Sequence, residues 1–132
     1  MEYENNKKLI LIIEDDIPLL NILTDELCRV GYTVLQAKDG ESGLAVALLE
    51  RPTLILLDVI MPKIDGLTVL KKIREENEWG KNVSVILLTN ISLSREIIDE
   101  TIDKDKSVKY IIKSNITMKN VVEKITEFIN KS

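Results

Sequence analysis

Two short apolar runs in this chain end directly in acidic side chains, and these acids are its clearest chemical feature. The acids are Glu14, Asp15 and Asp16 after the run 9–13, and Asp58 after the run 54–57. Apolar runs without alternation are typical of strands buried on both faces of a parallel sheet. If the two strands are neighbours, their acids meet at the carboxyl edge of the sheet, where such folds bind ligands. Converging carboxylates repel one another unless a hard cation with oxygen ligands relieves the repulsion, so the sequence predicts a Mg²⁺ site.

Composition excludes several other kinds of chemistry. The chain contains no histidine, which removes His-activated nucleophiles, His-ligated zinc and any role as a phosphohistidine donor. Cys28 is the only cysteine, so neither an internal disulfide nor a multi-cysteine metal site can form. We expect Cys28 to be a buried or half-buried filler in a helix. The chemistry is therefore left to carboxylates, hydroxyls and lysine.

Length and charge limit the class of protein. A chain of 132 residues with 45% hydrophobic content fits one domain, residues 1–132, and we see no output domain, linker or repeat. The net charge is −4 and the basic residues are scattered, so no direct contact with nucleic acid is expected. No apolar stretch is long enough to span a membrane, and the polar start does not resemble a signal peptide. We expect a cytoplasmic protein.

The hydrophobic pattern predicts five strands alternating with five helices. The strands are expected at 9–13, 33–37, from Leu54, at 83–88 and at 108–112, and the helices after Asp16, at 42–50, after Asp65, from Ser92 or Ser94, and after Thr117. Trp79-Gly80 marks the connection to the fourth strand. Parallel neighbours need right-handed crossovers, so this order indicates an α/β fold with a doubly wound parallel sheet.

The polar positions that follow these strands resemble the receiver domain of two-component response regulators, of the chemotaxis-regulator type. The resemblance covers residues 7 to 131 and rests on the acids after the first strand, Asp58, Met61-Pro62, Gly66, Thr89 and Lys113. It implies a flavodoxin-like sheet with strand order 2-1-3-4-5. It also implies a switch that is phosphorylated by a partner and catalyses only its own phosphorylation and dephosphorylation.

The resemblance assigns roles to the acidic residues. Asp58 becomes the phosphoacceptor, taking the phosphoryl group from a phosphohistidine on a histidine kinase or phosphotransfer protein. Asp15 is expected to bind Mg²⁺ directly with Asp58, and Glu14 through water. The backbone carbonyl of Ile60 completes the protein's ligands, while Asp16 is expected to cap a helix rather than bind metal.

The same resemblance assigns a response to three residues beyond the acids. Lys113 pairs with Asp58 and then with the phosphoryl group, and Thr89 supplies a hydroxyl to that group. Tyr110 is expected to change its packing together with Thr89. These shifts alter the face made by the fourth predicted helix, the fifth strand and the fifth helix, where a downstream protein binds. The protein is then a monomer or a phosphorylation-dependent dimer.

Two departures from the family pattern keep alternatives open. Ser114 replaces the proline that usually follows the lysine, and Asn90 replaces a smaller residue beside the threonine. A phosphorylation-independent receiver that serves as a binding module therefore stays possible. A Mg²⁺-dependent aspartyl-phosphate hydrolase is disfavoured because Ile60 stands where such enzymes carry a second aspartate. A flavodoxin-like cofactor binder is disfavoured because no glycine-rich loop follows the first strand.

Overall fold

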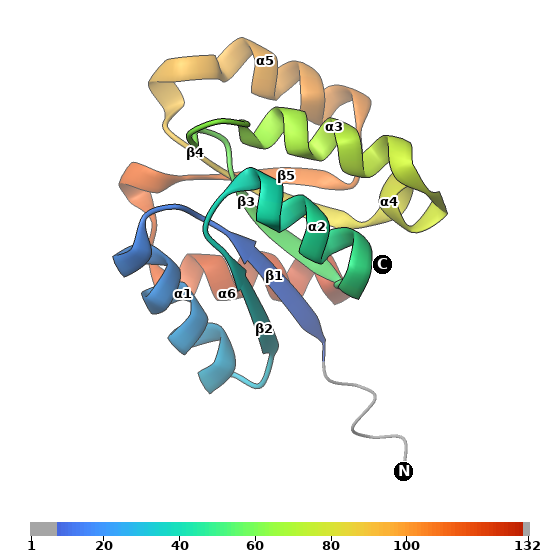
Figure 1. Cartoon of the computed structure of the whole chain (residues 1–132). Helices are drawn as coiled ribbons and strands as arrows, with labels where there is room; N and C mark the ends of the chain where they lie inside the picture. The colour runs from blue at the N-terminus through green and yellow to red at the C-terminus, as the bar shows by residue number, and fades with distance from the viewer. Residues whose placement is uncertain (1–7, 131–132) are drawn as a thin grey trace.

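Five parallel strands form one sheet in the order β2-β1-β3-β4-β5 (Figure 1). The computed structural model describes residues 8–130, apart from the side chains of residues 91–95, 97 and 98. Its elements are β1 (Leu9–Ile13), α1 (Ile17–Arg29), β2 (Thr33–Ala37), α2 (Gly40–Glu50), β3 (Leu54–Asp58), α3 (Gly66–Glu76), α4 (Glu78–Asn82), β4 (Ser84–Thr89), α5 (Ile91–Lys104), β5 (Val108–Ile112), the 3-10 turn η2 (Lys113–Asn115) and α6 (Met118–Asn130). The fold class and the strand order are those predicted from the sequence.

The helix number and two helix starts differ from the prediction. The short helix α4 lies in the segment expected to be a plain connection, because Asn77 caps it by accepting a hydrogen bond from the Gly80 amide at 2.7 Å. Helix α2 begins at Gly40 instead of Ser42, since Asp39 is its cap. Helix α5 begins at Ile91 instead of either predicted serine, with Asn90 at its N-cap.

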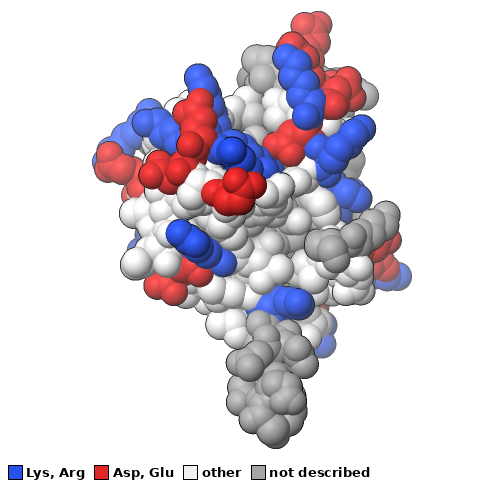
Figure 2. Space-filling model, turned by 90° about the vertical axis from the view of Figure 1, so that its right-hand side faces the viewer, with Lys and Arg blue, Asp and Glu red and all other residues white. Residues whose placement is uncertain are grey.

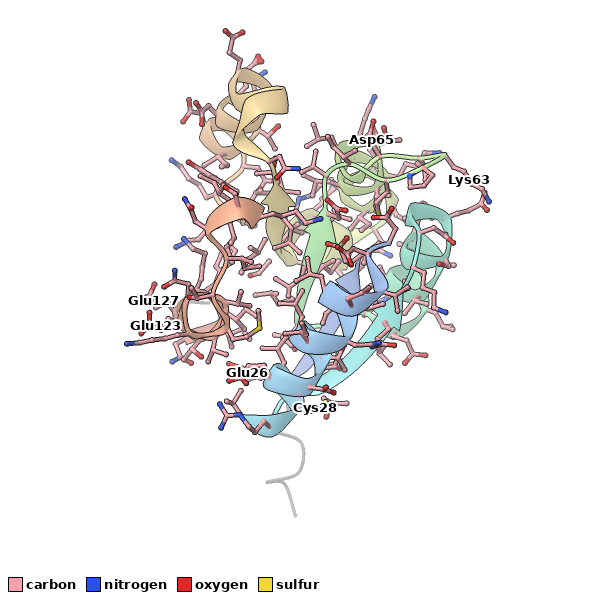
Figure 3. The ribbon with its side chains drawn as sticks, turned by 90° about the vertical axis from the view of Figure 1, so that its left-hand side faces the viewer. Glu26, Cys28, Lys63, Asp65, Glu123 and Glu127 are labelled. Carbon is pink, nitrogen blue, oxygen red and sulfur yellow. The ribbon has the colours of Figure 1, made fainter. Side chains whose placement is uncertain are left out.

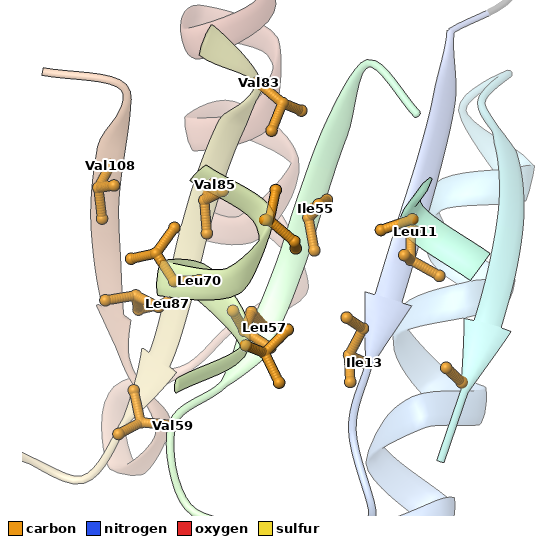
Figure 4. Close-up of a cluster of buried hydrophobic side chains, with 14 of the residues drawn as sticks. Leu11, Ile13, Ile55, Leu57, Val59, Leu70, Val83, Val85, Leu87 and Val108 are labelled. Atoms are coloured by element: carbon orange, nitrogen blue, oxygen red, sulfur yellow. The ribbon is translucent and has the colours of Figure 1, made fainter. Parts of the chain in front are cut away.

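Successive strand residues face opposite sides of the sheet and build two separate apolar clusters. Leu11 and Ile13 of β1 face the side covered by α2 and α3 (Figure 4). Ile10 and Ile12 face the side covered by α1 and α6. All four are fully buried, as expected for a strand between two helical layers. This double coverage leaves little but the ends of the inner strands β1, β3 and β4 open for chemistry.

The helices that frame the site start where the sequence predicted caps. Asp16 accepts a hydrogen bond from the Leu19 amide at 3.3 Å, and Asp65 accepts one from the Thr68 amide at 2.8 Å. Both caps fix how the chain leaves the carboxyl ends of β1 and β3. Residues of α1, the β3–α3 loop and α6 are labelled in Figure 3, where Lys63 and Asp65 lie in the loop above the strand ends.

The expectation for Cys28 was wrong. Cys28 is exposed near the end of α1 (Figure 3). The buried stripe of this helix contains Leu20, Leu23 and Leu27, and the next residue already points away from the core.

None of the helices among the described residues has the length and apolar character that a membrane span requires.

Candidate phosphoacceptor and metal site

The carboxyl ends of β1 and β3 bring three acids together, as the sequence suggested. Leu57 of β3 pairs with Ile13 of β1, so the residues that follow each strand are neighbours across the sheet edge. Glu14, Asp15 and Asp58 each offer one carboxylate oxygen, and these oxygens lie within 4.8 Å of one another. Glu14 is fully buried and Asp58 is only 3% exposed, whereas Asp15 lies open to solvent.

Lys113, the first residue after β5, closes this acidic cluster. Its Nζ lies 3.3 Å from Asp58 Oδ2 and 3.1 Å from Glu14 Oε1. Nζ donates a hydrogen bond to Glu14 Oε2 at 3.2 Å. The same oxygen also accepts a hydrogen bond from the Asp16 amide. The contact with Oε1 is therefore an ion-pair contact without hydrogen-bond geometry, and Oε1 is a buried oxygen that accepts no hydrogen bond from the described residues.

A cation fits this set of donors. The three carboxylates supply only oxygen ligands, which is what Mg²⁺ prefers, and one lysine cannot neutralise three nearby acids. Glu14 Oε1 contacts Lys113 but accepts no hydrogen bond from the described residues, so this buried oxygen keeps the capacity to bind a further positive group. Asp15 is the acid that faces solvent, from which a hydrated cation must arrive.

Burial and neighbouring charge shift the protonation of this cluster. Burial, together with the Glu14 carboxylate, raises the pKa of Asp58 from 3.8 to about 7, and Lys113 offsets only part of this. Burial by itself would lower the pKa of Lys113, but the Asp58 and Glu14 carboxylates outweigh it and raise that pKa. Without a further cation, the cluster therefore holds a charged lysine and an aspartate that titrates near neutrality.

The pKa of Asp58 gives the unfolding free energy a pH dependence of known sign. Between its unfolded and folded pKa values, the folded protein holds a proton that the unfolded chain has lost, so stability falls as pH rises toward 7. We expect a loss of about 2 kcal/mol between roughly pH 5 and pH 7 in EDTA. No histidine titrates in this window. Urea denaturation should show the slope in the wild type and a nearly flat profile in Asp58→Asn, and equal slopes would refute this assignment.

Of the other predicted site residues, Ile60 contacts the acidic cluster through its amide, whereas Thr89 bonds elsewhere. Ile60 is 49% exposed, and its amide lies 3.3 Å from Asp58 Oδ1, to which it donates. Thr89 is 3% exposed, and its hydroxyl donates to the carbonyl of Asn90 instead of to an acid of the cluster. Asn90 is exposed, and its side chain makes no capping hydrogen bond to α5.

Tyr110 lies further from the carboxyl edge of the sheet than the acids do. It pairs in register with Leu87 of β4, whereas Thr89 pairs with Ile112 at the strand end. Tyr110 is half-buried and packs against the apolar cluster on the side of the sheet covered by α2 and α3. Tyr110 also lines a groove beside Ile102 and Ile112, and none of its contacts among the described residues is to a carboxylate of the acidic cluster.

Two features of the site were missed in the sequence. Lys113 contacts Glu14 as well as Asp58, and no spacing in the chain announces that second contact. Gly66 packs so closely that a Cβ added to it would lie 2.2 Å from the carbonyl oxygen of Asp58. The Gly66 amide donates to the Val59 carbonyl at 2.8 Å, which clamps the loop that follows the phosphoacceptor candidate. The Asp65-Gly66 pair signalled a tight turn but not this contact.

A doubly wound sheet with acids and a lysine at its carboxyl edge places the chain in the flavodoxin-like class. Residues 10–126 match the family model described as the response regulator receiver domain, and the chain belongs to that family. Among solved structures, it resembles a CheY-like receiver domain protein from Methanospirillum hungatei, with TM-score 0.82 and 25% identity over 96% of each chain. It also shares the fold of CheY4 from Vibrio cholerae, with TM-score 0.82 and 21% identity over 92% of this chain and 98% of the other.

Curated relatives share part of their length with this chain. It is 43% identical over 86 residues to "Probable transcriptional regulator ycf27" of Cyanophora paradoxa, which is 65% of this chain and 34% of the relative. It is 45% identical over 71 residues to the alkaline phosphatase synthesis transcriptional regulatory protein PhoP of Bacillus subtilis, which is 54% of this chain and 29% of the relative. The matched part is about a third of each relative.

Proposed function

We propose that this chain is a phosphorylation-driven switch in which Asp58 accepts a phosphoryl group. The observation that carries the proposal is the buried Asp58 carboxylate, held between the Lys113 ammonium at 3.3 Å and two further acids with ligand oxygens within 4.8 Å. A donor phosphohistidine on a histidine kinase or phosphotransfer protein would lose its N–P bond as an O–P bond forms at Asp58. Family membership supports this chemistry, since receiver domains are the partners of such donors.

The residues of the site have separate tasks in this transfer. Asp15, Asp58 and, through water, Glu14 would hold Mg²⁺ together with the Ile60 carbonyl. Bound Mg²⁺ supplies charge neutralisation for the phosphoryl oxygens, which a carboxylate nucleophile otherwise repels. Lys113 contributes a fixed positive charge 3.3 Å from Asp58 Oδ2. Because the pKa of Asp58 is about 7, positive charge near it also favours the ionised, nucleophilic form.

The output surface follows from the position of Thr89 and Tyr110. A groove of about 600 Å³ runs between α5, β5 and α6, and Tyr110 lines it beside Ile102 and Ile112. We propose that a phosphoryl group on Asp58 draws the Thr89 hydroxyl toward it and that Tyr110 repacks, which changes this groove for a downstream protein. On the face in Figure 2, basic and acidic side chains intermix, so direct binding to nucleic acid is not part of the proposal. We place the switch in the cytoplasm, as a monomer or a phosphorylation-dependent dimer.

Intact-mass measurement after incubation with Mg²⁺ and acetyl phosphate tests the function. The wild type should gain one phosphoryl group, and Asp58→Asn or wild type in EDTA should gain none. Asp15→Asn should slow the gain at least tenfold, whereas Asp16→Asn, a matched change in the helix cap, should leave the rate within about twofold. Beryllofluoride binding, read by ¹⁹F NMR, detects a competent site even if the phosphorylated form is short-lived. If neither phosphorylation nor beryllofluoride binding occurs, the chain acts as a phosphorylation-independent binding module.

A further inference from the structure

The guanidinium of Arg74 ties together four segments away from the acidic site. Arg74 lies on α3, and only 15% of its side chain is exposed. Its Nη1 donates to the carbonyls of Gly80 in α4, at 2.8 Å, and Val83 before β4, at 2.7 Å. Its Nε donates to the carboxylate of Asp105 at 2.7 Å, just past the end of α5. A lysine could not reproduce this fork, because its single ammonium lacks the planar spread of donors.

Asp105 connects Arg74 to the end of α5 and to the turn before β5 through two further hydrogen bonds. Its amide donates to the Thr101 carbonyl at 3.0 Å, which closes the last turn of α5. Its Oδ1 accepts the Ser107 amide at 3.0 Å, while Oδ2 is the oxygen that Arg74 binds. Asp105 therefore joins the helix end through its amide, and the following turn and α3 through its carboxylate.

A groove lies beside the Arg74–Asp105 contact, between α3 and the C-terminal end of α5. Its volume is about 280 Å³. It is lined by Leu67, Leu70, Lys71 and Arg74 of α3, and by Thr101, Lys104 and Asp105 at the end of α5. Figure 1 shows α5 lying outside α3, at the rim of the domain. The opposite end of α5 starts two residues after Thr89, and its N-cap Asn90 makes no side-chain capping bond. Helix α5 is thus fixed at one end and uncapped at the end nearest the acidic site.

We propose that Arg74 is the positioning residue that makes the C-terminal end of α5 a fixed pivot. When the acidic site is filled, the end of α5 next to Thr89 moves while the end held by Asp105 stays in place. The movement rests on the proposed function of the site, whereas the anchoring by Arg74 does not.

Native-state amide hydrogen exchange of the full chain tests the anchor without any ligand. In Arg74→Gln and Asp105→Asn, exchange at residues 101–108 should rise at least tenfold relative to the core amides of β1 and β3 in the same sample. Arg74→Lys should fall between these variants and the wild type. The matched control is Arg29→Gln, which breaks the exposed ion pair with Glu26 and should leave residues 101–108 unchanged. The anchor is wrong if Arg74→Gln and Arg29→Gln behave alike in this region.

Beryllofluoride with Mg²⁺ then tests the pivot. In the wild type, exchange at residues 95–98 should change at least fivefold and that at residues 101–105 less than twofold. In Arg74→Gln, the change should reach both ends of the helix, an effect that lower stability alone would not produce. Equal changes at both ends of the wild-type helix would overturn the pivot. If ¹⁹F NMR shows no bound beryllofluoride, the proposed function fails and the pivot with it, while the unliganded comparison still decides the anchor.

Discussion

Replacing Lys113 by methionine should lower the unfolding free energy by about 3 kcal/mol at roughly pH 8 in the absence of Mg²⁺. The lysine is the only cation of the described residues in contact with Glu14 and Asp58, which are 0% and 3% exposed. Its removal leaves two buried carboxylates facing each other with no positive partner. Urea denaturation of both proteins gives the difference directly.

The same variant provides two internal checks. At roughly pH 5, Asp58 is protonated in the folded state, so the loss caused by Lys113→Met should shrink. Adding Asp58→Asn to Lys113→Met should recover part of the stability at pH 8, because one of the two charges is gone. A loss that is independent of pH and unchanged in the double variant would mean that Lys113 stabilises through packing instead of charge.

Gly66→Ala should damage stability and phosphorylation together. The added Cβ would lie 2.2 Å from the carbonyl oxygen of Asp58 and 2.9 Å from Cα of Val59. Both atoms belong to the backbone, so the loop after β3 must move and carry Asp58 with it. We expect a loss of about 3 kcal/mol in unfolding free energy. We also expect at least a tenfold slower gain of phosphoryl group from acetyl phosphate.

Gly31→Ala is the matched control for this substitution. A Cβ at Gly31 meets no atom within 4 Å, but its φ of +106° is unfavourable for alanine. This change should cost about 1 kcal/mol in stability and leave the phosphorylation rate unaltered, since Gly31 lies beyond the far end of α1. If Gly66→Ala behaves like Gly31→Ala in both measurements, the close packing against Asp58 has no functional weight.

The sequence predicted what depends on local pattern. Strand periods and the caps Asp16, Asp65 and Thr117 follow from residues close together in the chain. The convergence of the acids was also predictable, because parallel order alone brings the ends of β1 and β3 together. The start of α5 was missed, because the backbone turns into a helix directly at Asn90 without a capping side chain.

What could not be predicted depends on distances between distant segments. The contact of Lys113 with Glu14 joins residues 99 positions apart, and the tie from Arg74 to Asp105 joins residues 31 positions apart. The first contact depends on where β5 ends relative to β1, and the second on how α3 packs against the sheet and α5. Neither appears as a spacing in one sequence. The exposure of Cys28 was misjudged for a different reason: the local helical pattern already places it one residue past the buried Leu27 and so turned away from the core.

The helical layer formed by α1 and α6 has a consequence for synthesis on the ribosome. The first strand and the first helix contribute Ile10, Ile12 and Leu20 to a cluster whose other wall is Val121 and Ile125 of α6. Tyr32 and Thr126 join the same two regions through a hydrogen bond at 3.1 Å. The apolar face of β1 and α1 is therefore synthesised well before the residues of α6 that cover it. The nascent chain has to keep this face covered by other means until α6 leaves the exit tunnel.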